Sequence, residues 1–579
     1  MKVLNKISFL MAMILVLELS SCSIFQDYKF KDSMTNTYEQ EQVSSDVDNL
    51  AKLCRVWGYL KYRHPAFLLG KYNWDAELMS LIPKAITTHS NENFNMTLHE
   101  WFVSLGEVDY KMRVPKESSS NAMNITESDL TWTNDTSYLG EALVNDLALL
   151  PSILPTMLDR TAAPVFFDQL GVPIFSNETE PNIDYEDVNF RLVGLFRLWN
   201  VLEYFYPYLH LTDSNWNSVL LEAIPMMLKA TDQKSYEEVI SYVAMKLQDP
   251  HTQLKATTKG KELQYTPIDG MYYLPVSVTN VNGTLVITGA AENCPLQQGD
   301  ILLSINGMSI NELAAKKEKY YSLSREEYLL TGVCRAILNS TRKKIDVVVQ
   351  RNQNVLSVSV EGAAHYISDF KNKANNLPPY QIVDENIGIL NLGVVQTEDE
   401  LLDVMKALKN TDALIVDLRQ YPSVMGIYFF IPFFYKPSIV ISKPASASPG
   451  TYYKQTVLCG YDSSLLSYSS DYYPYENPVV VLINQDTISR GEYLATILKE
   501  SDNVTIIGEP SAGTDGNVAF LPIPGEIQLQ FTSFGIYTID GRQTQRVGIQ
   551  PDIYVHRSID GIKNGQDELI EFALKKLRE

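Results

Sequence analysis

The stretch Asn477-Pro-Val-Val-Val-Leu-Ile-Asn-Gln-Asp-Thr-Ile-Ser-Arg-Gly-Glu-Tyr-Leu-Ala-Thr-Ile-Leu-Lys499 combines a predicted strand, a turn and a helix. Residues 479–483 are an unbroken apolar run, mostly β-branched, which is typical of a strand buried on both faces of a parallel sheet. Leu494, Ile497 and Leu498 then recur at helical spacing. This order predicts one strand–helix unit of an α/β sheet.

Ser489 lies in the turn between this strand and this helix, and it has two interpretations. With Glu492 three residues later, it matches a capping box, in which the hydroxyl accepts a hydrogen bond from the first helical turn. The position also suits a nucleophile, because the carboxyl end of a parallel strand lies beside helix N–H groups that can stabilise an oxyanion. The stretch alone leaves both interpretations open.

Strands and helices continue to alternate on both sides of this stretch, over residues 378–579. Strands are predicted over 387–392, 413–416 and 504–507, and a helix over 398–408. A final helix closes the chain. This order favours an α/β core with a parallel or mixed sheet.

Residues 265–362 change to short alternating strands, which predicts a β-rich domain. Within it, Pro295-Leu-Gln-Gln-Gly-Asp-Ile-Leu-Leu-Ser-Ile-Asn-Gly307 resembles the central signature of a PDZ domain. Tyr273, Leu274 and Pro275 would then belong to a carboxylate-binding loop. Such domains bind extended peptide ends by adding a strand to a sheet edge. A packing module that has lost its groove is the alternative.

The region before this domain is helical and contains a repeat. Arg55-Val-Trp-Gly-Tyr-Leu-Lys-Tyr-Arg-His-Pro65 returns as Arg197-Leu-Trp-Asn-Val-Leu-Glu-Tyr-Phe-Tyr-Pro207, at a constant offset of 142 (199 − 57 and 207 − 65). We therefore expect two related helical units, over 46–160 and, with an irregular connection, over 161–260. The second unit ends in His251, which is either a hydrogen-bonded loop residue or a catalytic base.

The chain begins with a basic segment, an apolar run over 7–17 and then Leu19-Ser-Ser-Cys22. This pattern is typical of a bacterial lipoprotein signal, so we expect a signal peptide over 1–22 with a lipidated Cys22 and a linker over 23–45. A plain signal peptide with a chance cysteine is the alternative. The lipoprotein interpretation predicts a protein of the bacterial cell envelope, held in the membrane by its lipid and facing the periplasm or the exterior.

Composition excludes several classes of function. The formal net charge of −21 argues against nucleic acid as a partner. The cysteines beyond Cys22 are too far apart for a disulfide framework, and no C-x-x-C or H-E-x-x-H spacing suggests a metal. The chain also lacks the P-loop, dinucleotide and G-x-S-x-G patterns, so we expect neither a metal nor a cofactor. Its 579 residues require several domains.

The motifs of the chain, taken in order, resemble those of the tail-specific (C-terminal-processing) and tricorn-core serine peptidases. More narrowly, they resemble the lipoprotein-anchored bacterial branch with a PDZ domain. Besides the PDZ-like stretch, the motifs are Asp249-Pro-His-Thr252, Asp417-Leu-Arg419, Thr487-Ile-Ser-Arg-Gly-Glu492, and Gly508-Glu-Pro510 with Gly548-Ile-Gln-Pro-Asp552. The resemblance implies a multidomain α+β protein with a core of the ClpP/crotonase-like type, which hydrolyses peptides or unfolded proteins.

The resemblance also implies the catalytic residues. Tail-specific peptidases use a Ser–Lys pair, but Thr514 stands here at the position of the lysine. The tricorn-like arrangement instead makes Ser489 the nucleophile and His251 the base of an acyl-enzyme mechanism. Its third group, an acid in the family, falls on Gln545, which would orient the imidazole without adding a charge.

By the same resemblance, the backbone N–H groups of Arg490 and of Ser423 would form the oxyanion hole. The family usually has Gly-Gly where this chain has Ser423-Val424, so the loop loses the conformational freedom of glycine. This departure and the neutral Gln545 leave open a weak or inactive peptidase homologue that acts as a peptide- or ligand-binding lipoprotein. A purely structural or assembly lipoprotein is a further alternative, and the oligomeric state is open.

Overall fold

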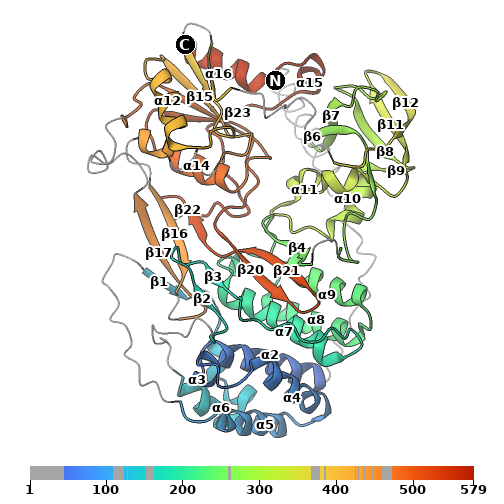
Figure 1. Ribbon diagram of the computed structural model, residues 1–579, viewed down its shortest axis with the longest axis vertical. Coiled ribbons are helices and arrows are strands. Elements are labelled where there is room, and N and C mark those ends of the chain that lie inside the picture. Colours follow the sequence, from blue (N-terminus) through green and yellow to red (C-terminus); the bar gives the residue numbers. More distant parts are fainter. Residues whose placement is uncertain are drawn as a thin grey trace, which may run out of the picture. The chain divides into compact units, whose positions relative to one another are not determined.

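The structure is a computed structural model, and it describes most of the chain from residue 45 onward (Figure 1). The elements below all belong to the unit Ser45–Glu579. The expected signal peptide, Cys22 and nearly all of the expected linker lie outside the described residues. No helix within the described ranges is both long enough and apolar enough to cross a membrane. The described residues are 45–108, 123–126, 128–150, 162–258, 262–366, 378–383, 386–423, 426, 429–434, 438–445, 448–458 and 472–579.

Two helical layers follow one another in the N-terminal half. The first contains α2 (Ser45–Lys61), α3 (Pro65–Leu68), α4 (Trp74–Thr87), α5 (Asn91–Ser104) and α6 (Thr136–Ala148), and the second α7 (Val188–Phe205), α8 (Trp216–Lys229) and α9 (Gln233–Met245). The repeat in the sequence corresponds to a repeated contact. Trp57 Nε1 donates to the Trp74 carbonyl at 2.8 Å, and Trp199 Nε1 donates to the Trp216 carbonyl at 3.0 Å. Each tryptophan therefore ties the first helix of its unit to a later one, α2 to α4 and α7 to α8.

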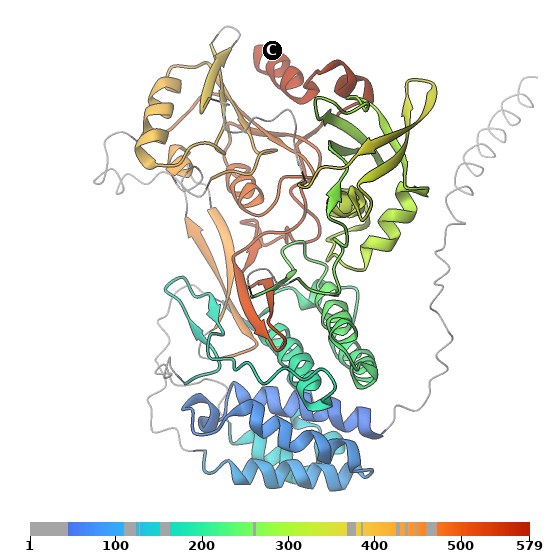
Figure 2. The ribbon, with the colours of Figure 1, turned by 45° about the vertical axis from the view of Figure 1, so that its right-hand side comes forward.

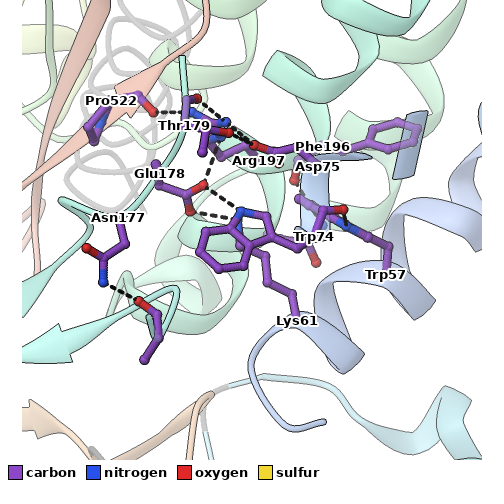
Figure 3. A network of polar contacts seen from close by, with 12 residues as sticks. Trp57, Lys61, Trp74, Asp75, Asn177, Glu178, Thr179, Phe196, Arg197 and Pro522 are labelled. Carbon is purple, nitrogen blue, oxygen red and sulfur yellow. Dashed lines mark hydrogen bonds and ion pairs between the residues drawn. The ribbon is translucent and has the colours of Figure 1, made fainter. Parts of the chain in front are cut away.

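A buried cluster of charges joins the two helical units (Figure 3). Lys61 Nζ lies 2.6 Å from Glu178 Oε1, and Arg197 Nε lies 3.1 Å from Glu178 Oε2. Arg197 Nη2 also pairs with Asp75 Oδ2 at 2.7 Å. Arg197 Nη1 donates to the Pro522 carbonyl at 3.1 Å, so the cluster connects both units to a strand that follows them by more than 300 residues in the chain.

Replacing Glu178 by glutamine should strongly destabilise this arrangement. Lys61 and Arg197 would each lose a buried counter-charge, which typically costs about 3–5 kcal/mol of unfolding free energy. Urea unfolding followed by circular dichroism measures the change. As a control, Glu361→Gln removes an ion pair with Lys343 whose side chains are 75% and 62% exposed, and it should leave the unfolding midpoint near the wild-type value. An equal loss of unfolding free energy in the two variants would contradict a stabilising role for the buried cluster.

The Pro522 carbonyl that accepts from Arg197 lies in β20 (Val518–Ile523). This strand forms a three-stranded antiparallel sheet with β21 (Ile527–Thr532) and β4 (Gln253–Ala256). Leu521, Leu529 and Phe531 of this sheet share one hydrophobic core with helix α7. The ribbon views show the sheet lying beside α7 (Figure 1, Figure 2). The short strand β4 begins two residues after His251. The sheet therefore brings the end of the second helical unit against a hairpin from the C-terminal part of the chain.

Residues 265–362 form the predicted β-rich region, with an antiparallel sheet of order β12-β11-β8-β7-β6. Helix α11 (Leu329–Ile337) packs against the same core as these strands, and β6 lies at one edge of the sheet. The other members are β6 (Val276–Val281), β7 (Thr284–Ala290), β8 (Ile301–Ile305), β9 (Met308–Ser309), β11 (Lys344–Arg351), β12 (Asn354–Glu361) and helix α10 (Ile310–Glu318).

The C-terminal core is a six-stranded mixed sheet, as its alternating pattern predicts. Its order is β13 (Tyr380–Val383), β14 (Ile387–Leu390), β15 (Ala413–Asp417), β18 (Val479–Ile483), β19 (Val504–Gly508) and β23 (Ile553–Tyr554), with all neighbours parallel except the first pair. Every residue of β18 is buried, which confirms the two-sided strand predicted there. Its side chains alternate between a core with α12 (Glu398–Leu408) and α14 (Arg490–Leu498) and a core with α16 (Glu568–Arg578).

The remaining elements are short or connect these parts. A further sheet has the order β1 (Met123–Thr126), β17 (Thr451–Leu458), β16 (Ser438–Pro444) and β22 (Gly535–Tyr537). Two pairs are formed by β2 (Phe166–Phe167) with β3 (Pro173–Ile174) and by β5 (Tyr272–Tyr273) with β10 (Asn339–Ser340), and helix α15 (Ile559–Asn564) precedes α16.

Candidate active site

Ser489 occupies the turn between β18 and α14 in a strained backbone conformation, with φ 53° and ψ −116°. Positive φ is uncommon for residues other than glycine, and such strain concentrates at functional sites. The side chain makes no capping hydrogen bond. The backbone holds the turn instead, because the Ser489 N–H donates to the Thr514 carbonyl at 3.0 Å and its carbonyl accepts from the Tyr493 N–H at 2.8 Å. The hydroxyl is therefore not used as a helix cap.

Glu492 does not complete a capping box either. Its buried Oε1 accepts a hydrogen bond from the Gly513 N–H at 2.5 Å, so the carboxyl holds the loop that contains Thr514. Burial raises the pKa of Glu492 to about 8. Burial, and then the nearby Glu492, also raises the pKa of Asp515 well above its usual range. The S-x-x-E pattern thus serves a contact between loops, not the helix end.

Glu492→Gln should weaken the pH dependence of stability. With a folded-state pKa of about 8 against an ordinary 4.5, the folded chain binds a proton that the unfolded chain releases between these values. Protonated Glu492 thus adds to the stability of the folded state at low pH. This contribution to the unfolding free energy is lost as the pH rises through about 8. Calorimetric melting at pH 5, close to the lower end of this window, and at pH 9, roughly one unit above its upper end, should show a smaller gap in melting temperature for Glu492→Gln than for wild type. The exposed control Glu476→Gln should keep the wild-type gap; an equal gap in all three proteins would refute the expectation.

His251 lies just beyond α9 and is largely buried, with 7% of its surface exposed. Its ring Nδ1 lies 2.9 Å from Thr532 Oγ1, and the Thr532 hydroxyl donates to Asp249 Oδ2 at 2.6 Å. Asp249 Oδ1 accepts from the His251 N–H at 3.0 Å. Burial lowers the pKa of His251, while the Asp249 charge acts in the opposite direction. A lowered pKa keeps the imidazole neutral near pH 7, as a general base requires.

Thr514 connects the two candidate catalytic residues. Its carbonyl accepts the Ser489 N–H, and its hydroxyl donates to Asp249 Oδ1. Thr514 thus brings the Ser489 turn and the His251 turn together. The side chains of Ser489 and His251 are not hydrogen-bonded to each other in the structure.

Gln545 is fully buried, but the structure does not place it on His251. Neither its side-chain oxygen nor its nitrogen has a hydrogen-bond partner among the described residues. The ring position expected for Gln545 is occupied by Thr532, which sequence reasoning missed. No local pattern marks Thr532, because it lies 281 residues from His251 and meets it only through strand pairing.

The two expected oxyanion donors differ in availability. Arg490 is the first residue of α14, and no acceptor for its N–H occurs within the described part of the chain. Helix N-termini leave such N–H groups unpaired. The Ser423 N–H, in contrast, donates to the Leu392 carbonyl at 3.1 Å, so it is not free in this conformation. Val424 lies outside the described residues.

The expected carboxylate-binding loop has no free donor. The Tyr273 N–H donates to Ala363 and the Leu274 N–H to Leu338, both at 2.8 Å, and Pro275 has no N–H. These residues therefore do not offer the N–H groups that a peptide carboxylate would need.

A different contact links the β-rich region to the catalytic loop. Gln485 Oε1, four residues before Ser489, accepts from Asn280 Nδ2 of β6 at 3.1 Å and from Thr331 Oγ1 of α11 at 2.5 Å. Within the described ranges, no three histidine, cysteine, aspartate or glutamate side chains lie together as ligands for a metal ion.

Comparisons with known proteins indicate a peptidase family for part of the chain. Residues 386–555 match the model of peptidase family S41. The chain is 24% identical over 348 residues to the carboxy-terminal-processing protease of Bartonella bacilliformis. The aligned region covers 58% of this chain and 73% of that protein. These matches confirm the family resemblance predicted from the ordered motifs, and they do not favour the alternative of a mere binding protein.

Solved structures similar to this chain have low sequence identity to it. Mature CPAF is 13% identical, with a TM-score of 0.51 over 67% of this chain and 96% of that one. The photosystem II D1 C-terminal processing protease is 14% identical, with a TM-score of 0.39 over 66% and 98%. At such identity the likeness to CPAF shows the fold alone.

Proposed function

We propose, from the premise that residues 386–555 belong to peptidase family S41, that this protein is a serine peptidase with Ser489 as nucleophile and His251 as general base. One observation carries the assignment of residues. Ser489 lies in a strained, uncapped turn at the carboxyl end of β18, and Thr514 joins that turn to Asp249 beside His251.

The proposed reaction is acyl transfer in two steps. His251 Nε2 accepts the proton of the Ser489 hydroxyl while Oγ forms a bond to the carbonyl carbon of the substrate, and the oxyanion develops beside the Arg490 N–H. The imidazolium then gives the proton to the leaving amine as the C–N bond breaks. Water hydrolyses the acyl-enzyme with His251 again as base. Catalytic hydrogen bonds often tighten only when substrate binds, so the missing Ser489–His251 bond does not oppose this role.

A fluorophosphonate probe tests the nucleophile directly. The protein should become labelled, and mass spectrometry of the digested adduct should place the label on Ser489. An inactive homologue that only binds peptides would remain unlabelled. Labelling at another residue, or labelling that survives Ser489→Ala, would refute the assignment.

We further propose that the β-rich region 265–362 acts as a PDZ-like module that guides extended substrates. Support comes from strand β6, which lies at the sheet edge with α11 in the same core. Main-chain pairing along β6 would supply affinity, since the N–H groups of Tyr273 and Leu274 are already used. An unfolded polypeptide substrate should slow hydrogen exchange of the β6 amides; unchanged exchange would oppose the proposal.

We also propose that Cys22 carries a lipid that anchors the protein in the cell envelope. The support is the signal pattern of the first residues of the sequence. Cells fed an alkyne-tagged fatty acid should produce labelled protein, and Cys22→Ser should abolish the label. A label that persists in this variant would place the modification elsewhere.

A further inference from the structure

Two residues hold the His251 ring although no motif assigns them to it. Asp249 and Thr532 form a continuous hydrogen-bonded chain with the ring, at 2.6 Å between Asp249 Oδ2 and Thr532 Oγ1 and 2.9 Å between Thr532 Oγ1 and His251 Nδ1. We propose that Thr532 and Asp249 are the positioning residues of His251, in place of an acid at the position of Gln545. The inference rests on the proposed role of His251 as base.

The strand register explains why Thr532 meets His251. Strands β4 and β21 pair Gln253 with Gln530 and Leu254 with Leu529 in antiparallel register. The same register continued by two residues sets position 251 opposite position 532 (253 − 2 and 530 + 2). Gln530 Nε2 also donates to the His251 carbonyl at 2.9 Å, which fixes the backbone beyond the end of β4. The hairpin therefore delivers a hydroxyl to one side of the ring.

The direction of these hydrogen bonds selects the tautomer of His251. Both oxygens of Asp249 act as acceptors, since Oδ1 receives the His251 N–H and the Thr514 hydroxyl and Oδ2 receives the Thr532 hydroxyl. A hydroxyl has one proton, so Thr532 can only accept from the ring. Nδ1 must then carry the ring proton, and Nε2 keeps a free lone pair. This is the tautomer that can accept the proton of Ser489.

Asp249 also supplies the charge that Gln545 lacks. Asp249 and Thr532 are both fully buried, so the carboxylate acts on the ring in surroundings with little water to screen it. An imidazolium formed during the reaction would donate from Nδ1 to Thr532, whose proton is already directed to Asp249. Gln545, with neither side-chain atom bonded, takes no part in this chain.

Paired variants of Thr532 test the proposal through kinetics. Thr532→Val keeps the shape but removes the hydroxyl, and it should lower kcat by roughly 10- to 100-fold, less than the full loss of a general base, while KM stays the same. The acid limb of kcat/KM should move to lower pH, because the imidazolium loses its acceptor. Thr532→Ser should restore both quantities. Thr411→Val, which removes a buried threonine hydroxyl that contacts Leu408 and Tyr475, should behave like wild type.

A readout without catalysis separates this inference from the proposed function. In protein labelled with ¹⁵N-histidine, and with His251 assigned by His251→Gln, NMR should show the Nδ1–H tautomer in wild type and a shift towards Nε2–H in Thr532→Val. An unchanged tautomer together with wild-type kcat and pH profile in Thr532→Val would overturn the inference. If turnover does not depend on Ser489, the proposed function fails, and the tautomer measurement still decides the role of Thr532.

Discussion

Ser489→Ala should reduce kcat/KM for peptide hydrolysis by about 10⁵- to 10⁶-fold, the loss typical of removing a serine nucleophile. The Thr514 hydroxyl cannot simply take its place, because it already donates to Asp249. Alanine keeps the Cβ atom at the strained φ of 53°, and the turn should therefore persist. Cleavage of a quenched fluorogenic peptide measures the rate, and thermal melting checks that the variant is folded.

A matched serine separates loss of the nucleophile from loss of structure. Ser501, buried near the end of α14, can be changed to alanine with little expected effect on turnover. If Ser489→Ala kept a rate within about threefold of the Ser501→Ala protein, far above the residual rate left by binding and an oxyanion donor alone, the acyl-enzyme mechanism would be excluded.

His251→Ala should lower kcat/KM by about 10²- to 10⁴-fold, because general acid–base catalysis is lost while the oxyanion donor remains. Wild type should show an acid limb below the ordinary histidine value of about 6.5, since burial lowers the pKa of His251. The neutral ring is the active form, so the rate should rise with pH through this pKa and be level by neutral pH. Rate profiles between about pH 4.5 and 9 cover this range.

The variant should also lose this acid limb, because its residual rate no longer depends on the ring. His556→Gln is the control, since this histidine is more than half exposed and pairs with Glu509 at 3.0 Å. It should reproduce the wild-type profile. Full activity in His251→Ala, or an acid limb shared by both variants, would show that another group acts as the base.

Ser489 and Glu492 show how far local pattern carries a prediction. The apolar run before Ser489 predicts a strand buried on two faces, and β18 is one, because alternating side chains of a central strand must meet a core on each side. The capping box fails although its spacing is correct. The Glu492 carboxyl instead accepts a hydrogen bond from the Gly513 N–H. This N–H belongs to a loop that comes near Glu492 only in the folded chain.

His251 and its partners show the opposite limit. The ordered motifs single out His251, Ser489 and Gln545, and the comparisons confirm the family to which those motifs point. The motifs do not reveal Thr532, because its position opposite His251 follows from the register of β4 and β21. The occupied N–H groups of Ser423, Tyr273 and Leu274 are likewise visible only once their carbonyl partners are in place.

The sequence by itself determined the order of helical, β-rich and α/β regions, the strand and helix around Ser489 and the family of the core. These features depend on side-chain periodicity and on motifs a few residues long, which are local. The tertiary structure alone decided which group orients His251, which oxyanion donor is free and what Glu492 holds. Buried polar atoms must find partners, and strand pairing between distant segments decides which partners are within reach.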